Sequence, residues 1–274
     1  MKKIAVLSLL SVLLLAACRD SIRDKDTTVD FTTEQTLAQH VLNDIFFNYH
    51  HFALEDSVIG SNSDTIFDNV KDGCLKAVYY SSQNGVNAVV FDYENNTSAC
   101  SDTKIRSGRM VAKVTGRYTD SLSTTTITFS NFKTDNILIE GTMVIKNRGI
   151  QADGKKKLEV DFTDVILSSD TLRILVDFDE VFYQTAGITT DSDTDDSFEI
   201  TGSSNGIITN GNSFNAVITE ILTATSSCEW ITRGKITITP KNLVPRKIDY
   251  GSGSCDKSIS LTKNDVTQTI ELPY

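Results

Sequence analysis

Apolar and polar residues alternate one by one along much of the chain from about residue 75 onward. In the clearest run, Leu158, Val160 and Phe162 stand between polar or charged residues, and residues 172–178 repeat the pattern. Successive side chains of a β-strand point to opposite faces, so each such strand buries one face and exposes the other. Antiparallel sheets show this pattern, whereas buried parallel strands read as continuous apolar runs. The alternation therefore predicts a mainly β, antiparallel fold.

Short turn signals separate the alternating runs. They are rich in Asn, Asp, Ser and Gly, the residues that tolerate the backbone conformations of tight turns. The signals are Thr134-Asp135-Asn136, Asp153-Gly154, Ser168-Ser169-Asp170, Asn210-Gly211 and Asn264-Asp265. Their spacing predicts an antiparallel meander of about ten to thirteen strands.

One amphipathic helix is expected ahead of the strands, at about residues 33–54. Thr32 and Gln35 fit a capping box at its start. Because one helix cannot cover the apolar faces of so many strands, the sheet must fold over on itself. A sandwich and a curved open barrel that clasps the helix both meet this requirement. The predicted apolar stripe of the helix consists of Leu37, Val41, Leu42, Ile45, Phe46, Tyr49, Phe52 and Ala53.

The first residues of the chain are typical of a signal peptide. Two lysines precede an uninterrupted apolar run over residues 4–17, which is shorter than the roughly 20 residues of a membrane-spanning helix. Residues 15–18, Leu-Ala-Ala-Cys, resemble the lipobox of bacterial lipoproteins. The resemblance implies removal of residues 1–17 and acylation of Cys18, for example by palmitate. An ordinary signal peptide with a Cys at its cleavage site is the alternative.

The segment that follows the lipobox is highly charged, and we expect residues 18–31 to form a flexible tether. Arg19, rather than Asp, follows the lipidated position. By resemblance to lipoprotein sorting, this implies an outer-membrane lipoprotein, at the cell surface or on the periplasmic face. Residues 32–274 are expected to form a single β-rich domain that contains the helix.

The charge of the chain narrows the possible partners. The formal net charge is −10, and it becomes −12 once the two lysines of the signal peptide are removed. A field of this sign repels nucleic-acid backbones and favours a soluble monomer. We therefore expect no nucleic-acid partner, and membrane contact only through the lipid anchor.

Four cysteines remain when the lipobox Cys is set aside, and four cysteines allow three disulfide connectivities. Cys74 and Cys100 are separated by almost the same interval as Cys228 and Cys255, and similar residues precede the second Cys of each pair. This repetition predicts the disulfides Cys74–Cys100 and Cys228–Cys255 in an oxidising compartment. A four-Cys zinc site is disfavoured because the chain has no Cys-x2-Cys pair.

Short motifs recur through the β region. The most specific are Cys-x-Trp-Ile at residues 228–231 and Asp-Tyr-Gly-x-Gly-x-Cys-Asp at residues 249–256. Together they resemble motifs of uncharacterised β-rich lipoproteins of the Bacteroidota, over about residues 74–272. The resemblance implies an anchored antiparallel β protein and carries no activity with it. The earlier motifs are Gly108-Arg109, Thr115-Gly116-Arg117-Tyr118, Ile139-Glu140-Gly141-Thr142 and Glu199-Ile200-Thr201-Gly202.

No residue pattern predicts a catalytic or metal site. His40, His50 and His51 are the only histidines, and helix geometry keeps them from sharing one ion, so we expect them to be solvated or helix-terminal. The acidic segment 191–196 lacks the Gly and the closing Glu of an EF-hand and is expected to be a solvated hairpin turn. Trp230 is expected to pack in the core against a disulfide.

No sequence pattern pairs a Ser, Cys or Thr with a His that could act as its general base, so no nucleophile is predicted. Glycoside hydrolysis requires a pair of carboxylates. The 36 acidic residues of the chain allow many such pairs once it is folded, so the sequence leaves this activity open. We expect no enzyme activity, no catalytic residue, no metal and no cofactor.

Two functional hypotheses follow. The first is a lipid-anchored cell-envelope protein that acts non-catalytically as a scaffold, an adhesin-like protein or an accessory binding module, with an envelope protein, glycan or lipid as its partner. The alternative is a carrier of a lipid or other apolar ligand in a cavity between curved sheet and helix. A large apolar cavity lined by inward-facing residues would favour the carrier. A core filled by Phe, Ile and Leu would favour the first hypothesis.

Overall fold

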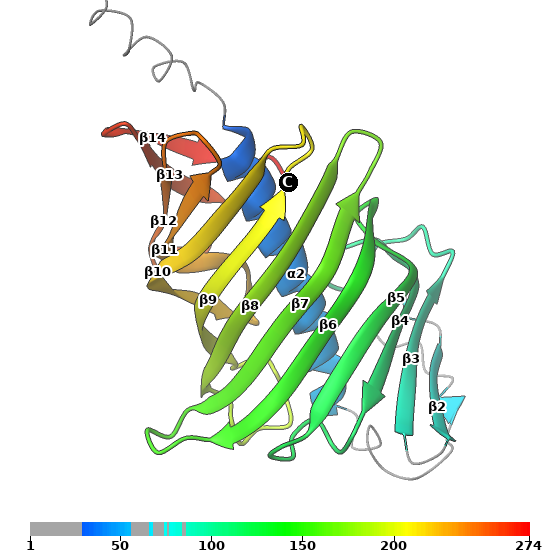
Figure 1. Ribbon diagram of the computed structural model, residues 1–274. Coiled ribbons are helices and arrows are strands. Elements are labelled where there is room, and N and C mark those ends of the chain that lie inside the picture. The colour runs from blue at the N-terminus through cyan, green and yellow to red at the C-terminus, as the bar shows by residue number, and fades with distance from the viewer. Residues whose placement is uncertain (1–28, 56–65, 68–73, 76, 84–85) are drawn as a thin grey trace, which may run out of the picture.

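The computed structural model describes residues 29–55, 66–67, 74–75, 77–83 and 86–274 (Figure 1). The predicted signal peptide, Cys18 and most of the predicted tether lie outside these residues. In this part of the chain, the helix α2 (Asp30–Glu55) is followed by the strands of one sheet. The strands are β1 (Ile66–Phe67), β2 (Ala77–Gln83), β3 (Val86–Glu94), β4 (Arg106–Val114), β5 (Thr124–Thr134), β6 (Ile137–Ile150), β7 (Lys156–Ser168), β8 (Arg173–Ala186), β9 (Ser197–Ile207), β10 (Ser213–Thr225), β11 (Cys228–Pro240), β12 (Arg246–Ser252), β13 (Ser258–Lys263) and β14 (Val266–Glu271).

Every strand pairs antiparallel with its neighbour in sequence, so the spatial order follows the chain from β1 to β14. The predicted antiparallel meander is confirmed. Among the described residues the sheet has 14 strands when the two-residue β1 is counted. The sheet is not closed, because β1 and β14 stand at opposite ends of the strand order.

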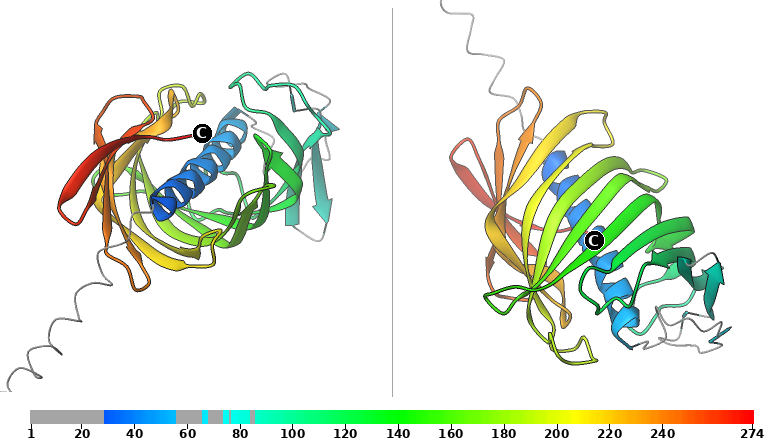
Figure 2. Two further views of the ribbon diagram at one scale, coloured as in Figure 1. Left: turned by 90° about the horizontal axis from the view of Figure 1, so that it is seen from above. Right: turned by 60° about the horizontal axis from the view of Figure 1, so that its bottom comes forward.

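The sheet curves around α2 and encloses the helix on most of its sides (Figure 2). Of the two architectures that the sequence leaves open, the structure has the curved open sheet that clasps the helix. A single buried helix fills the concave face, so a second sheet is not needed to cover it.

Glycines within the strands allow this curvature. Gly202 on β9 has a φ of +140°, and a Cβ at this position would lie 2.2 Å from the backbone oxygen of Asp179 on β8. Gly234 on β11 is related to Ile221 on β10 in the same way, at 2.4 Å. The pairing register also shifts within several strand pairs, including β4 with β5 and β6 with β7. Such irregularities bend and twist a sheet, whereas regular pairing without them keeps it flatter.

The predicted turns lie at the connections between consecutive strands. Asp135 and Asn136 join β5 to β6, and Asn264 and Asp265 join β13 to β14. Each of these four residues has a positive φ, as a two-residue type I′ hairpin requires.

Helix α2 is buried on nearly every side because the sheet wraps around it. The predicted stripe lies in the core, where Leu42, Phe46 and Tyr49 are at most 1% exposed. Polar residues outside the stripe are buried as well, among them Gln35 and Gln39. The helix is therefore a central core element, and the sheet leaves a single face of it uncovered (Figure 2).

The start of the helix differs from the prediction. It begins at Asp30, so Asp30 and Phe31 belong to the folded domain and not to the tether. Thr32 and Gln35 lie within the helix, and the Thr32 hydroxyl and the Gln35 side-chain oxygen have no hydrogen-bond partner among the described residues. The predicted capping box is therefore wrong. The buried ring of Phe31 adds apolar surface to the first turn, which favours the earlier start.

The structure pairs Cys74 with Cys100 and Cys228 with Cys255, as the spacing predicts. Cys74 precedes β2 and Cys100 follows β3, whereas Cys228 begins β11 and Cys255 follows β12. Each bridge thus joins the two ends of a strand pair, one toward each end of the sheet.

Candidate functional site

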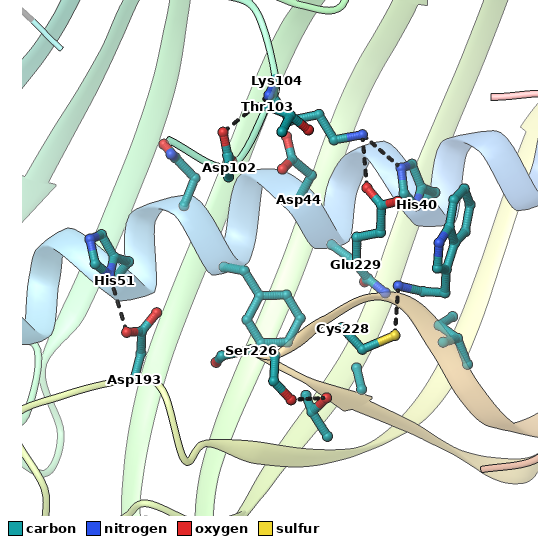
Figure 3. A pocket seen from close by; sticks show the side chains of 18 of the residues that line it. His40, Asp44, His51, Asp102, Thr103, Lys104, Asp193, Ser226, Cys228 and Glu229 are labelled. Carbon is teal, nitrogen blue, oxygen red and sulfur yellow. Dashed lines mark hydrogen bonds and ion pairs between the residues drawn. The ribbon is translucent and has the colours of Figure 1, made fainter. Parts of the chain in front are cut away.

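A groove of about 410 Å3 runs over the face of α2 that the sheet leaves uncovered (Figure 3). One face of the helix forms its floor, with side chains recurring at intervals of three or four residues. At a rise of about 1.5 Å per residue, the floor is roughly 16 Å long. The floor consists of His40, Asn43, Asp44, Phe47, Asn48 and His51.

Three segments that are distant in sequence form the walls. Residues 101–104 and Arg106 contribute one wall. Residues 224–231, which comprise the end of β10, the turn and the start of β11, contribute another, and Asp193 comes from the connection between β8 and β9. The disulfides brace two of these walls, because Cys100 immediately precedes the first and Cys228 belongs to the second. The groove is therefore built from a buried helix and stapled loops.

Arg106 forms the best-buried ion pairs of the groove. Its guanidinium lies 2.6 Å from Asp44 and 2.7 Å from Asp102, and the side chain is only 2% exposed. Burial by itself would lower the pKa of Arg106, but the two carboxylates outweigh burial and raise it above its ordinary value. Arg106 thus stays charged and ties the 101–106 segment to α2.

Lys104 joins the two long walls of the groove. Its ammonium lies 3.4 Å from Glu229 on β11 and 3.4 Å from Asp135. Burial opposes the charge of Lys104, but Asp44, Glu229 and Asp135 together raise its pKa. Figure 3 shows Lys104 and Glu229 converging on the end of the groove where His40 lies.

His40 belongs to a small aromatic cluster. Its ring is stacked on the ring of Trp230, with the two centroids 4.6 Å apart. The ring centroid of Tyr274 lies 5.2 Å from that of His40. Lys104 donates to Nε2 of His40 at 3.4 Å, so the ring proton resides on Nδ1. Burial and the neighbouring Lys104 lower the pKa of His40. The ring is therefore neutral in the groove.

Trp230 lies beside a disulfide and also borders the groove. Its backbone N–H donates to the sulfur of Cys228 at 3.4 Å, which places it beside the disulfide as predicted. Its side chain is only partly buried, however, and lines the groove. The expectation that Trp230 is plain core packing is therefore incomplete, because the ring packs on the core with one part and borders the groove with another.

His50 is expected from the sequence to be solvated or helix-terminal; it lies near the end of α2, but its side chain is fully buried, so it is not solvated. Its Nε2 lies 2.5 Å from a carboxylate oxygen of Asp196 and its Nδ1 lies 2.8 Å from the hydroxyl of Tyr118. A neutral imidazole satisfies both contacts, because Nε2–H donates to the carboxylate and Nδ1 accepts from the tyrosine. Burial lowers the pKa of His50, although Asp196 opposes this. The residue holds the helix to the sheet and does not reach the groove.

The acidic segment 191–196 is also less solvated than predicted. Asp196 is buried and accepts from Gln184 at 2.9 Å in addition to His50. Asp193 lies 3.1 Å from His51, and its contact with His51 lowers the pKa of Asp193. Asp193 and Asp196 thus contact different residues of α2, and Asp193 lines one end of the groove, whereas Asp191 and Asp195 are exposed as predicted.

Glu180 is a buried acid that the sequence analysis did not single out. It accepts from Gln39 at 3.0 Å, and burial raises its pKa to about 8. A signal was present in the sequence, because Glu180 continues the inward-facing series of Val176 and Phe178 on β8. An acid at such a position has to face the core.

No family model, no curated protein and no solved structure matches the chain. Among the residues that the structure describes, no helix has the length and apolar character needed to span a membrane. No group of three or more His, Cys, Asp or Glu side chains in this part of the chain is arranged to hold a metal ion.

Proposed function

We propose that this protein is a lipid-anchored cell-envelope protein that acts non-catalytically as a binding module, with the groove over α2 as its ligand site. The lipobox resemblance of residues 15–18 supports the anchor at Cys18 and an outer-membrane location. The observation that carries the binding proposal is the groove itself. Its volume of about 410 Å3 lies within the range of about 300–1,000 Å3 that is usual for small-molecule sites.

The state of the acidic groups supports a non-catalytic role. Asp44 and Asp102 are both paired with Arg106, and Glu229 is paired with Lys104. A general acid or base must be able to exchange its proton near neutral pH. A carboxylate that is already engaged by a cationic side chain is a poorer candidate for that work than a free one.

The filled interior of the sheet favours this proposal over a carrier of lipid or another apolar ligand. The ring centroid of Phe46 lies 4.4 Å from that of Phe182 and 5.5 Å from that of Phe198. Side chains of the helix thus occupy the concave face where a lipid would have to lie. The groove outside the helix is lined largely by polar side chains, which acyl chains avoid.

The anchor is tested by fractionation. The Cys18→Ser variant should leave the membrane fraction or remain uncleaved, and the wild-type protein should carry the added mass of acyl chains on residue 18. Unchanged fractionation of the variant, with no acyl mass on the wild type, would refute the lipoprotein part of the proposal.

The groove is tested through Trp230, which is the only Trp in the chain and lines the groove. Material released from the envelope of the source cells should change its fluorescence in a saturable way. Ser101→Phe places a ring at the exposed groove wall and should abolish the change. Ser169→Phe, at an exposed turn outside the groove, should preserve it. An identical response of both variants would refute the groove as ligand site.

A further inference from the structure

We infer that the groove over α2 takes a neutral saccharide. This inference rests on the proposal that the groove is a ligand site, and it names the class of ligand. Four properties of the lining carry it: the pairing of its charges, its unused amide donors, the acceptors close to those donors and its aromatic side chains.

The charged groups of the groove are engaged with one another, although the carboxylates outnumber the basic groups. Arg106 is paired with Asp44 and Asp102, Lys104 with Glu229, and His51 with Asp193. A charged ligand would have to compete with these pairs or leave one partner uncompensated, which is costly in a partly buried site. The acidic residues also outnumber the lysine and arginine residues in the lining, so an anionic ligand is further disfavoured. The groove thus suits an uncharged ligand.

Two amide side chains offer hydrogen-bond donors to such a ligand. The Oδ1 atom of Asn48 accepts from the hydroxyl of Tyr93 at 2.8 Å, and the Oδ1 atom of Asn43 accepts from Gln39 at 3.3 Å. These contacts fix the orientation of both amides on the floor of the groove. In the described residues their NH2 groups have no hydrogen-bond partner. Each amide therefore presents up to two donors to the groove.

Acceptors lie close to these donors. Carboxylate oxygens that already take part in an ion pair retain further lone pairs, and Asp102 and Glu229 are 46% and 48% exposed. Hydroxyl groups of Ser101 and Thr103 on the same wall can donate or accept. Donors and acceptors interspersed in this way match a ligand that carries many hydroxyl groups, because each hydroxyl both donates and accepts.

The aromatic lining matches the remaining surface of a sugar. Phe47 and Trp230 both line the groove and are only partly buried. A sugar ring combines a polar rim with less polar faces of C–H groups, and such faces pack well against aromatic side chains. A groove with both amide donors and aromatic rings therefore fits a saccharide better than it fits a wholly polar ion or a wholly apolar acyl chain.

A peptide fits the groove less well. The common modes of peptide recognition use the free edge of a sheet, an apolar groove or an arginine cluster. Here the floor is a helix, whose backbone groups are consumed by its own hydrogen bonds. The cationic side chains are held in the ion pairs described above. Binding of a peptide in place of a saccharide would overturn the inference.

The test uses the full-length protein purified in a detergent without a sugar head group. It is applied to an array of neutral oligosaccharides built from glucose, mannose, galactose or N-acetylglucosamine, beside uronic-acid and sulfated oligosaccharides and a panel of uncharged peptides. The best neutral binder is then titrated while the fluorescence of Trp230 is recorded. We expect saturable binding that changes little between about 0.05 and 0.5 M salt, because screening acts on charges.

Variants locate the binding site. Asn48→Ala should weaken the neutral binder by about tenfold, as expected for loss of a hydrogen bond in a partly buried site. Asn210→Ala is the control, because Asn210 lies at an exposed turn and does not line the groove; it should leave the affinity unchanged. Equal affinity of both variants would place the saccharide elsewhere and overturn the inference.

The array separates failure of the inference from failure of the proposed function. Binding of acidic saccharides or peptides alone, with the Trp230 signal sensitive to Ser101→Phe, would overturn the neutral-saccharide class and keep the groove as a ligand site. No binding to any neutral saccharide would likewise overturn the inference. If, in addition, envelope material does not change the fluorescence of Trp230, the proposed function is overturned as well.

Discussion

The Nε2 atom of His50 lies 2.5 Å from a carboxylate oxygen of Asp196, and neither side chain is exposed to solvent. His50 is on α2 and Asp196 immediately precedes β9, so the contact fastens the helix to the connection that closes one end of the groove. The neighbouring His51 makes a similar contact with Asp193, but those two side chains are 26% and 17% exposed. Two adjacent histidines thus contact two acids of the same segment at different depths.

This difference in depth makes a prediction. His50→Phe removes one of the two side-chain hydrogen bonds of the buried Asp196 and should lower the free energy of unfolding by roughly 2–3 kcal/mol, as expected for a buried hydrogen bond to a charged group. His51→Gln should cost less than about 1 kcal/mol, because its contact is partly solvated. Urea unfolding at neutral pH measures both. Equal losses would contradict a structural role specific to His50.

Glu180 should make the stability depend on pH. Its pKa is raised to about 8 in the folded protein, chiefly by burial, whereas an unfolded chain has a value near 4.3. The folded state therefore retains a proton that the unfolded state loses. The stabilisation is complete below the unfolded pKa and is lost as the pH rises through about 8.

The variant Glu180→Gln removes this titration. It should unfold at a higher urea concentration than the wild type at pH near 9, with a gain on the order of a few kcal/mol, and should show a flatter dependence above pH about 5. Glu220→Gln, at a residue that is 59% exposed, should leave the slope unchanged. A wild-type slope that persists in Glu180→Gln would show that another group is responsible.

Curvature of the sheet should depend on its strand glycines. In Gly202→Ala the new Cβ would lie 2.2 Å from the backbone oxygen of Asp179, at a φ of +140°, and stability should fall by roughly 3 kcal/mol or more. Gly116→Ala is the control, because the nearest atom to its Cβ would be 3.7 Å away. Thermal unfolding should show little change for the control. Equal effects would mean that close backbone approach does not govern this position.

The second disulfide should stabilise both the fold and the groove. Replacing Cys228 and Cys255 together by Ser should lower the free energy of unfolding by about 3.5 kcal/mol, as the chain-entropy treatment gives for a loop of this size. The emission of Trp230 should also shift, because its backbone N–H contacts the sulfur of Cys228. Replacing Cys74 and Cys100 together by Ser, which leaves the contact of Trp230 with Cys228 in place, should shift the emission less. Non-reducing peptide mapping should recover Cys74 with Cys100 and Cys228 with Cys255.

Several features of the molecule follow from the sequence alone, because they depend on neighbouring residues. Alternation at period two predicts antiparallel strands, and Asp135-Asn136 predicts the hairpin in which both residues adopt a positive φ. The repeated interval between cysteines predicts the two disulfides. None of these inferences requires knowledge of how distant strands are placed.

Tertiary structure decides the remaining features. The sequence leaves a sandwich and a sheet that clasps the helix open, and the close backbone approach at positions such as Gly202 is seen only in the folded sheet. Once the sheet wraps around α2, the helix has almost no wet face, so His50 and Gln39 are buried although helical periodicity places them outside the apolar stripe. The groove combines Asn48, Lys104 and Trp230 from three distant segments. Local sequence determines the elements, whereas burial and the groove arise from contacts between residues far apart in the chain, which no local pattern encodes.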